Sequence, residues 1–372
     1  MRILVVNWRC IKNPLAGGAE IYLQEICRRL VQRGHEITLV AERFAGSALE
    51  EEIDGVRVKR MGKKWTFNWT VYRQIGKLVR EGDFDIVIDD LNKIPFYSPW
   101  FTDKPVLVLL MHLFRRSIFR EAIAPFALYV YLTESLIPLA YKKCLFAVLS
   151  ESSKRDVVRL GIPPEQITVV PPGTDFERYQ PDPRVKKEPV VLHVGRLKKY
   201  KSTEHLLYAA RLLKERGRVF QVVVVGTGDD LPRLERIVEK LGLKETVRFT
   251  GFVSEEEKIQ WYRRSALLVE SSIKEGWGLI VIEANACGTP VIVARSPGLV
   301  DSSRDGVNGF FYDYGDITQL AEKIDLLLRD GALRTRLGEQ AVSWARQWTW
   351  DGATDKIEVL LKETVERHKW AH

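Results

Sequence analysis

Two glutamates, Glu275 and Glu283, are eight positions apart in a segment that combines a strand, a turn and a helix. Residues 266–272 are apolar enough to form a buried strand, and residues 291–294 predict another strand after the helix. Glu275 is therefore expected on a loop at the carboxyl end of a strand, and Glu283 one turn along the helix. Both carboxylates could accept hydrogen bonds from hydroxyl groups.

The turn between the two glutamates is rich in glycine. Gly276 and Gly278 let the backbone turn tightly, so free N–H groups near Leu279 and Ile280 can face an anion at the helix N-terminus. A phosphate there, with one carboxylate before it and one behind it, predicts a site that holds a diphosphate, a hexose and a ribose together. The alternative interpretation is an ordinary helix with a surface glutamate.

Basic residues follow an earlier predicted strand, residues 190–194. Gly195, Arg196 and Lys201 come directly after it, so a guanidinium and an ammonium could neutralise a diphosphate at the same sheet edge. Such groups would act mainly on the leaving oxygen, where negative charge develops. The alternative is surface charge.

Other glycine turns are weaker signals. Gly226 opens a G-x-G turn after residues 221–225, but Leu231 occupies the place of the third glycine in a dinucleotide-binding motif. Gly17 and Gly18 follow the first predicted strand, where the backbone could approach a diphosphate or an acceptor, or where a loop simply needs positive φ.

Strands and helices alternate in two successive series, which predicts an α/β protein with two doubly wound, Rossmann-like domains facing a central cleft. The first domain is expected over residues 1–182 and the second over residues 183–350, with a proline-rich linker near residues 179–189. Ligands of such sheets collect outside the carboxyl ends of the strands. Strands are predicted at 2–7, 36–41, 85–89, 105–111, 145–150, 190–194, 221–225, 247–250, 267–270 and 291–294.

Four motifs, which follow one another along the chain in the expected order, resemble those of retaining family 4 glycosyltransferases, also called glycosyl transferases group 1, which have the GT-B fold. They are the E-x7-E segment with Trp277 in place of the commoner Phe, Gly17-Gly-Ala-Glu20, Pro172-Gly-Thr-Asp175, and Gly195-Arg-Leu-Lys-Lys-Tyr-Lys201. The last predicted helix, 351–372 with its flanking residues, resembles the crossover that returns to the N-terminal domain of that family. The resemblance covers most of the chain.

The resemblance implies a retaining transfer of a hexose-type sugar from a nucleoside diphosphate sugar, of UDP or GDP type, to an acceptor hydroxyl, without metal or cofactor. It implies that Glu275 binds hydroxyls of the sugar and Glu283 the ribose. Arg196 and Lys201 would hold the phosphates, and His112 would contact the transferred sugar. The implied donor-binding residues are Gly17, Gly18, Gly195, Arg196, Lys201, Gly226, Phe252, Val253, Glu275, Gly276, Trp277, Gly278, Leu279, Ile280 and Glu283.

Two other functions stay open. A GT-B sugar-nucleotide 2-epimerase would release an altered sugar without an acceptor, and a non-catalytic sugar-nucleotide-binding subunit could support a glycosylation complex. Asp83 and Asp85 form a D-x-D pair, but they precede a strand instead of following one, so no metal site is predicted. Asp89, Asp90, Asn92 and Lys93 follow a strand on the expected acceptor side and receive no specific role.

Composition fits a cytoplasmic enzyme. The 372 residues carry a formal net charge of +8, four scattered cysteines, no apolar run long enough to cross a bilayer and no recognisable nucleic-acid-binding module. No cleavable signal peptide is expected. Residues 112–146 mix aromatic and basic side chains, which suits either peripheral contact with the inner face of the membrane or a buried helical hairpin with solvated basic ends. Membrane contact would suit a lipid-linked acceptor, and a glycan is the other acceptor expected.

Overall fold

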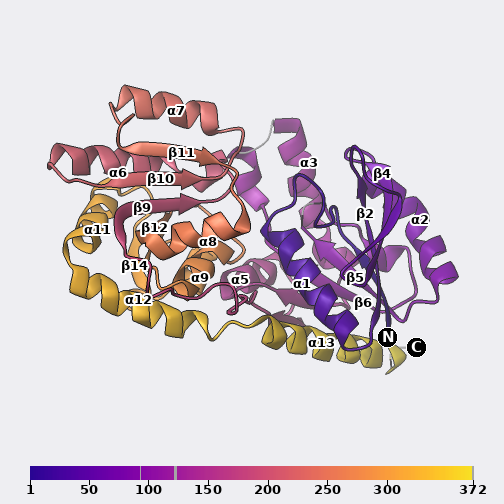
Figure 1. Ribbon diagram of the computed structural model, residues 1–372. Coiled ribbons are helices and arrows are strands. Elements are labelled where there is room, and N and C mark those ends of the chain that lie inside the picture. Colours follow the sequence, from indigo (N-terminus) through magenta and orange to yellow (C-terminus); the bar gives the residue numbers. More distant parts are fainter. Residues whose placement is uncertain (93, 121–123, 371–372) are drawn as a thin grey trace. The chain divides into compact units, whose positions relative to one another are not determined.

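The computed structural model describes residues 1–92, 94–120 and 124–370, so Lys93 and part of segment 112–146 lie outside the described residues. The chain forms two compact units (Figure 1). Unit 1 contains Met1–Gly173 and Trp350–His372, and unit 2 contains Thr174–Thr349. Each unit is an α/β structure built on one sheet.

The sheet of unit 1 has eight strands in the order β3-β4-β2-β1-β5-β6-β7-β8. All neighbouring pairs are parallel except β3 and β4. The central strands are buried along their whole length, as parallel strands covered by helices should be. The strands are β1 (Arg2–Val6), β2 (Glu36–Arg43), β3 (Glu50–Ile53), β4 (Val56–Lys63), β5 (Ile86–Leu91), β6 (Val106–Leu110), β7 (Leu145–Val148) and β8 (Ile167–Val169).

Helices of unit 1 cover both faces of this sheet. Helices α2, α3 and α5 share one hydrophobic core with alternate strand residues such as Val87 and Val108, whereas α1 packs against α13, which contacts β6 and β7. The helices are α1 (Gly18–Gln32), α2 (Phe67–Gly82), α3 (Ala124–Ser135), α4 (Ile137–Ala140), α5 (Glu151–Leu160) and α13 (Trp350–Trp370), with short 3-10 turns η1 (Ser98–Trp100), η2 (Arg115–Arg120) and η3 (Pro164–Gln166).

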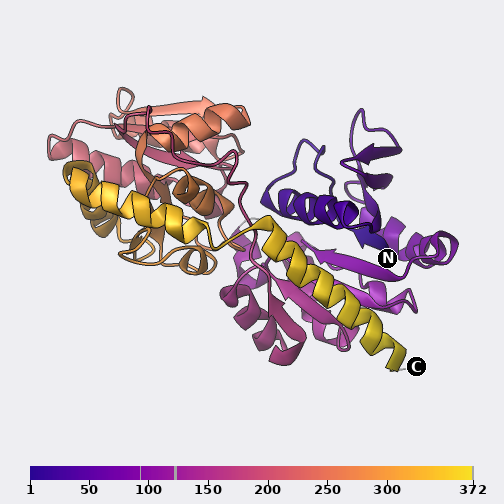
Figure 2. The same ribbon diagram turned by 60° about the horizontal axis from the view of Figure 1, so that its bottom comes forward.

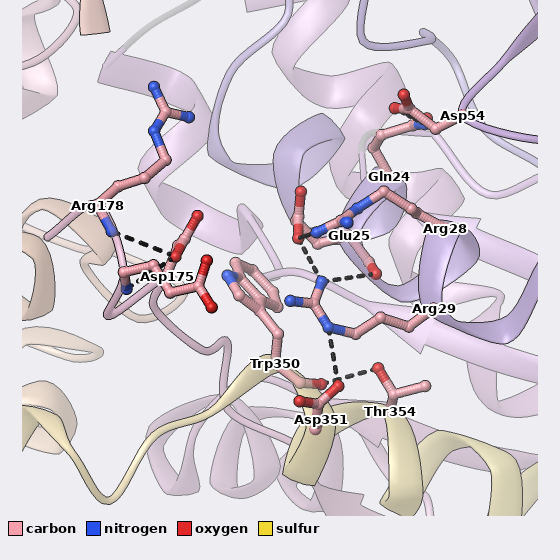
Figure 3. Close-up of polar contacts among 11 residues, drawn as sticks. Gln24, Glu25, Arg28, Arg29, Asp54, Asp175, Arg178, Trp350, Asp351 and Thr354 are labelled. Carbon is pink, nitrogen blue, oxygen red and sulfur yellow. Dashed lines mark hydrogen bonds and ion pairs between the residues drawn. The ribbon is translucent and has the colours of Figure 1, made fainter. Parts of the chain in front are cut away.

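The contact between α1 and α13 has a charged centre (Figure 3). The Arg29 guanidinium donates to Asp351 over 3.1 Å and pairs with Glu25 one turn earlier on α1. It also lies 5.9 Å from the ring centroid of Trp350, the first residue of α13. The Thr354 hydroxyl donates to the Trp350 carbonyl over 2.8 Å. This cluster fixes the start of α13 on unit 1.

Unit 2 contains six parallel strands in the order β11-β10-β9-β12-β13-β14. Helices α8 and α9 contact β9, β12 and β13, and α11 contacts β12, β13 and β14 (Figures 1 and 2). The strands are β9 (Glu188–Val194), β10 (Gln221–Val225), β11 (Val247–Gly251), β12 (Ser265–Glu270), β13 (Val291–Ala294) and β14 (Gly309–Tyr312). The helices are α6 (Glu204–Glu215), α7 (Leu231–Lys240), α8 (Glu255–Arg264), α9 (Leu279–Ala286), α10 (Leu299–Ser302), α11 (Ile317–Arg329) and α12 (Gly331–Ala345), with the 3-10 turn η4 (Lys199–Lys201).

The strands predicted from the sequence are all present, with ends displaced by one or two residues. Strands β3, β4, β8 and β14 were not predicted. The unit boundary lies between Gly173 and Thr174, so the predicted boundary at residue 182 falls within unit 2. Contacts explain this placement, because Thr174 donates its N–H to the Trp348 carbonyl over 3.1 Å and Arg178 pairs with Glu256 over 3.2 Å, all within unit 2.

Candidate active site

The loop that carries Glu275 joins β12 to α9, as predicted. Gly278 precedes α9 with φ of +100°, and a Cβ there would lie 3.0 Å from the Leu299 side chain. Only glycine adopts this conformation without strain. The Glu275 N–H donates to the Pro297 carbonyl over 2.9 Å, which ties the loop to the next strand connection. The segment therefore has the strand, glycine turn and helix arrangement of an anion-binding site.

Lys201 lies beside Glu275. Its ammonium is 2.7 Å from a Glu275 oxygen and 3.7 Å from an oxygen of Glu270, the last residue of β12. Burial alone would lower the pKa of Lys201, but the charges of Glu270 and Glu275 outweigh it and raise the pKa above its ordinary value. Lys201 is therefore held as a cation within a group of two carboxylates.

The glycine turns after β9 and β10 pack against each other. A Cβ on Gly226 would come 1.9 Å from the Gly195 carbonyl oxygen, so the turn after β10 needs glycine at this contact. A Cβ on Gly195 would lie 3.8 Å from the Lys201 ammonium, which places that turn next to the lysine. The Arg196 side chain, by contrast, is exposed. Backbone packing therefore explains why residue 226 is glycine, independently of any contact with a nucleoside.

Glu283 is mostly buried on α9 and is held by two residues of α8 that the sequence analysis missed. The Tyr262 hydroxyl donates to Glu283 over 2.8 Å, and the Lys258 ammonium is 3.1 Å away. Burial first, and then the charge of Glu283, raises the pKa of Tyr262 far above its usual range. The alternative of a surface glutamate is therefore wrong. Phe252 and Val253 directly precede Ser254, the N-cap residue of α8. The Phe252 ring is exposed.

The tryptophan of the turn packs against a second tryptophan of unit 2. Trp277 is buried and its ring packs edge-on against Trp348, with ring centroids 4.9 Å apart. Its neighbours Gly276, Leu279 and Ile280 are half-buried. This packing places the ring in the core behind the turn, and the implied role of Trp277 in donor binding stays a prediction.

Three candidate residues belong to unit 1. Gly17 and Gly18 begin α1, and neither has positive φ, so that explanation of the two glycines is wrong. The Gly17 N–H donates to Glu20 over 2.7 Å, and the other Glu20 oxygen accepts from the Asn92 amide over 3.2 Å. His112 follows β6, half-buried, with its ring centroid 4.6 Å from that of Phe114.

Unit 2 contains three groups of predicted residues. One group is Lys201 with Glu275, the second is Glu283 beside α8, and the third is the pair of turns at Gly195 and Gly226. Together they offer a lysine ammonium, two carboxylates and a helix N-terminus, which is chemistry suited to a phosphorylated, hydroxyl-rich ligand. Within the described ranges, no group of three or more His, Cys, Asp or Glu residues is arranged to hold a metal ion. Metal independence stays a prediction.

Two family models match the chain in adjoining regions. The model of glycosyl transferases group 1 matches residues 175–344, and that of glycosyltransferase family 4 matches residues 16–178. These matches define the class of the protein, a glycosyltransferase. The chain belongs to the family 4 glycosyltransferases.

Curated relatives carry one name repeatedly. A D-inositol 3-phosphate glycosyltransferase of Nocardia farcinica is 28% identical over 372 residues, which cover 90% of this chain and 82% of that protein. Its namesake from Streptomyces bingchenggensis is 34% identical over 244 residues, 60% of this chain. That second match spans about half, 54%, of the relative's length.

Solved structures share the whole fold at low identity. A sucrose-phosphate synthase from Thermosynechococcus elongatus has a TM-score of 0.83 and 20% identity, with 97% of this chain and 98% of that chain covered. HepE from Anabaena, solved in complex with UDP-glucose, has a TM-score of 0.80 and 21% identity, with 98% and 100% covered. The predicted GT-B architecture is confirmed.

Proposed function

We propose that this glycosyltransferase moves a hexose-type sugar from a nucleoside diphosphate sugar, of UDP or GDP type, to an acceptor hydroxyl with retention of configuration and without a metal. The observation that carries the proposal is the half-buried Glu275, paired with Lys201 at the glycine-capped start of α9. A carboxylate that accepts sugar hydroxyls and a cation that faces phosphate are both needed to hold such a donor. UDP-glucose bound to HepE supports a donor of this class.

Two observations, the names of the relatives and an exposed apolar surface, suggest acceptors. The names of the curated relatives suggest a phosphorylated polyol such as inositol 3-phosphate, which we would test first. A lipid-linked acceptor or a glycan remains the second candidate, supported by the apolar surface described below. A sugar-nucleotide 2-epimerase and a non-catalytic binding subunit are the alternatives.

Calorimetry with UDP, GDP, ADP and their sugar conjugates tests the donor. We expect one nucleotide family to bind wild type and to bind Glu283→Ala at least tenfold more weakly, because a buried charged hydrogen-bond partner is worth about 1.5–3 kcal/mol. Glu339→Ala, which removes an exposed glutamate of α12, is the matched control and should bind like wild type. Absence of binding to every nucleotide would refute the proposal.

Nucleotide release then separates the three functions. A transferase releases nucleoside diphosphate faster when a suitable acceptor is added. An epimerase releases nucleotide and an altered free sugar at a rate that does not depend on an acceptor, and a binding subunit releases neither. NMR coupling at the anomeric position gives the configuration of the new linkage. Comparison with the configuration of the donor sugar shows whether the transfer is retaining.

We also propose that unit 1 contacts an anionic membrane surface through α3. The helix presents an exposed apolar stripe in which Leu128 and Leu132 are 50% and 54% exposed and Leu139 of α4 is 68% exposed. The only charged residue of α3, Glu134, is buried and accepts the backbone N–H groups of Phe114 and Arg115. An apolar face of this kind suits the boundary between headgroups and acyl chains. It does not fit a buried hairpin.

The stripe continues onto the turn that precedes α2. Trp65 is 73% exposed, its ring centroid is 6.4 Å from that of Phe126 on α3, and the Lys64 ammonium is 5.2 Å from the Trp65 ring. Exposed tryptophan beside lysine is typical of protein surfaces at membrane interfaces, where the ring lies among headgroups and the cation meets anionic lipid. No helix within the described residues is long and apolar enough to cross a membrane.

Sedimentation with vesicles tests this contact. Vesicles with anionic lipid at low salt should bind wild type, and Leu132→Ser with Trp65→Ser should lose most of the binding. Val219→Ser, at a valine that is 90% exposed in unit 2, is the matched control. Equal binding by wild type and the double variant, or no binding to anionic vesicles, would refute the proposal. A concentration-dependent dimer that the double variant abolishes would assign the stripe to a second copy of the chain.

A further inference from the structure

A second carboxylate, Glu270, accompanies Lys201 and is not part of any motif found in the sequence. It is the last residue of β12 and its side chain is fully buried. One oxygen lies 3.7 Å from the Lys201 ammonium and also accepts hydrogen bonds from the Ser272 N–H, over 3.2 Å, and the Ser272 hydroxyl. The other oxygen is buried and has no hydrogen-bond partner within the described residues.

The two carboxylates around Lys201 differ in their access to a ligand. The Glu275 side chain is 17% exposed, whereas that of Glu270 is 0% exposed. Glu275 can therefore turn its oxygens to a bound sugar, and Glu270 cannot. A buried ammonium needs a counter-charge in every state of the protein, because an unpaired buried charge is strongly destabilising. Glu270 can supply that charge when Glu275 is engaged elsewhere.

The backbone around the lysine strengthens this arrangement. The Ser271 hydroxyl donates to the carbonyls of Lys201 and Ser202, over 2.9 and 2.8 Å, and the Ile273 N–H donates to the Tyr200 carbonyl over 2.9 Å. The strand end that carries Glu270 is thus bound to the turn that carries Lys201. The position of the ammonium relative to the carboxylate follows from these contacts.

We propose that Glu270 is a positioning residue that holds the Lys201 ammonium and offsets its charge, so that the diphosphate is bound less tightly than by an uncompensated lysine and Glu275 can exchange its contact with the ammonium for hydroxyls of the sugar. The inference rests on the proposed function. One ammonium between two carboxylates leaves the group with a net charge of −1. An incoming diphosphate therefore meets a weakened cation, which favours release of the nucleoside diphosphate after transfer.

Calorimetric titration of Glu270→Gln with UDP and GDP tests the inference. The substitution removes one negative charge without changing the shape, so the nucleotide that wild type binds should bind about tenfold more tightly at low salt. The gain should be smaller for the corresponding nucleotide sugar, which carries less negative charge. It should also shrink as salt is added, because screening weakens the interaction. A loss of folding alone would not tighten binding.

Two further variants separate charge from structure. Glu270→Asp keeps the charge and should retain wild-type affinity within about threefold, whereas Ser272→Ala removes the hydroxyl that donates to Glu270 and should also have little effect. If Glu270→Gln does not fold, tighter nucleotide binding by Glu270→Ala, which removes the same charge, carries the same test. If wild type binds a nucleotide and Glu270→Gln binds it equally or more weakly, the inference about Glu270 is overturned and the proposed function is not. If neither protein binds any nucleotide, the proposed function fails, and the inference fails with it.

Discussion

Gly298 packs closely against the backbone of Glu275, and its replacement by alanine gives a quantitative test of the site. Gly298 precedes α10 with φ of +84°, and a Cβ there would lie 2.2 Å from the Glu275 carbonyl oxygen. Cβ atoms do not approach other atoms closer than 3.0 Å, so the Glu275 backbone must move by nearly 1 Å. Gly306, with φ of +71°, has no atom within 4 Å of the same added group and is the matched control.

Both alanine variants should lose stability, but only one should lose activity. Left-handed backbone costs a non-glycine residue about 1–2 kcal/mol, so the unfolding free energy of Gly306→Ala should fall by about that amount, and that of Gly298→Ala should fall further because of the clash with Glu275. A misplacement of about 1 Å at a reacting group can lower the rate about 100-fold. We therefore expect Gly298→Ala to reduce kcat/KM about 100-fold, equal to about 2.7 kcal/mol, and Gly306→Ala to change it less than threefold.

The assay is hydrolysis of the nucleotide sugar in the absence of acceptor, followed by release of nucleoside diphosphate, with urea unfolding measured on the same preparations. Hydrolysis needs the donor site and no acceptor, so the result does not depend on the acceptor's identity. Equal kcat/KM for the two variants, with both folded, would show that the position of the Glu275 backbone does not matter and would refute the reasoning.

Two other perturbations follow from buried groups. Burial, then the charges of Glu20 and Asp89, raises the pKa of Asp90 well above its ordinary value of 3.8. The folded protein therefore keeps a proton that the unfolded chain loses, and stability falls as pH rises from about 3.8 toward the folded pKa, by up to about 1.4 kcal/mol per pH unit. Asp90→Asn should remove this slope from urea unfolding measured across that range, and an unchanged slope would contradict it. Tyr262→Phe removes the 2.8 Å hydrogen bond to Glu283, so unfolding free energy should fall by about 1.5–3 kcal/mol and nucleotide should bind more weakly in calorimetry; unchanged values of both would show that the bond is dispensable.

The strand, turn and helix around Glu275 could be predicted because all the information is local. An apolar run, two glycines and an apolar helix occur within one continuous segment, and each follows a short-range rule. The partners of the two glutamates could not be predicted in the same way. Lys258 and Tyr262 approach Glu283 because α8 packs on α9, and Glu270 approaches Lys201 because β12 pairs with β9.

The strands that were missed have physical reasons as well. Strand β3 is almost entirely acidic, so it lacks the apolar alternation of a half-buried strand. It pairs with β4 across Asp54 and Gly55, both of which have positive φ, and that Asp-Gly turn was a usable hairpin signal. The direction of the Trp277 ring was not predictable, since it depends on Trp348, far along the chain.

The bridge between Thr174 and Thr349 has a consequence for synthesis of the chain. These two residues are the ends of unit 2 and pair with each other, so unit 2 is a continuous segment whose ends meet. Unit 1, by contrast, lacks α13 until residues 350–370 have left the ribosome. The second unit can therefore finish folding first, while the segment made earliest waits for its last helix. That order reverses the usual N-terminal-first sequence of domain folding.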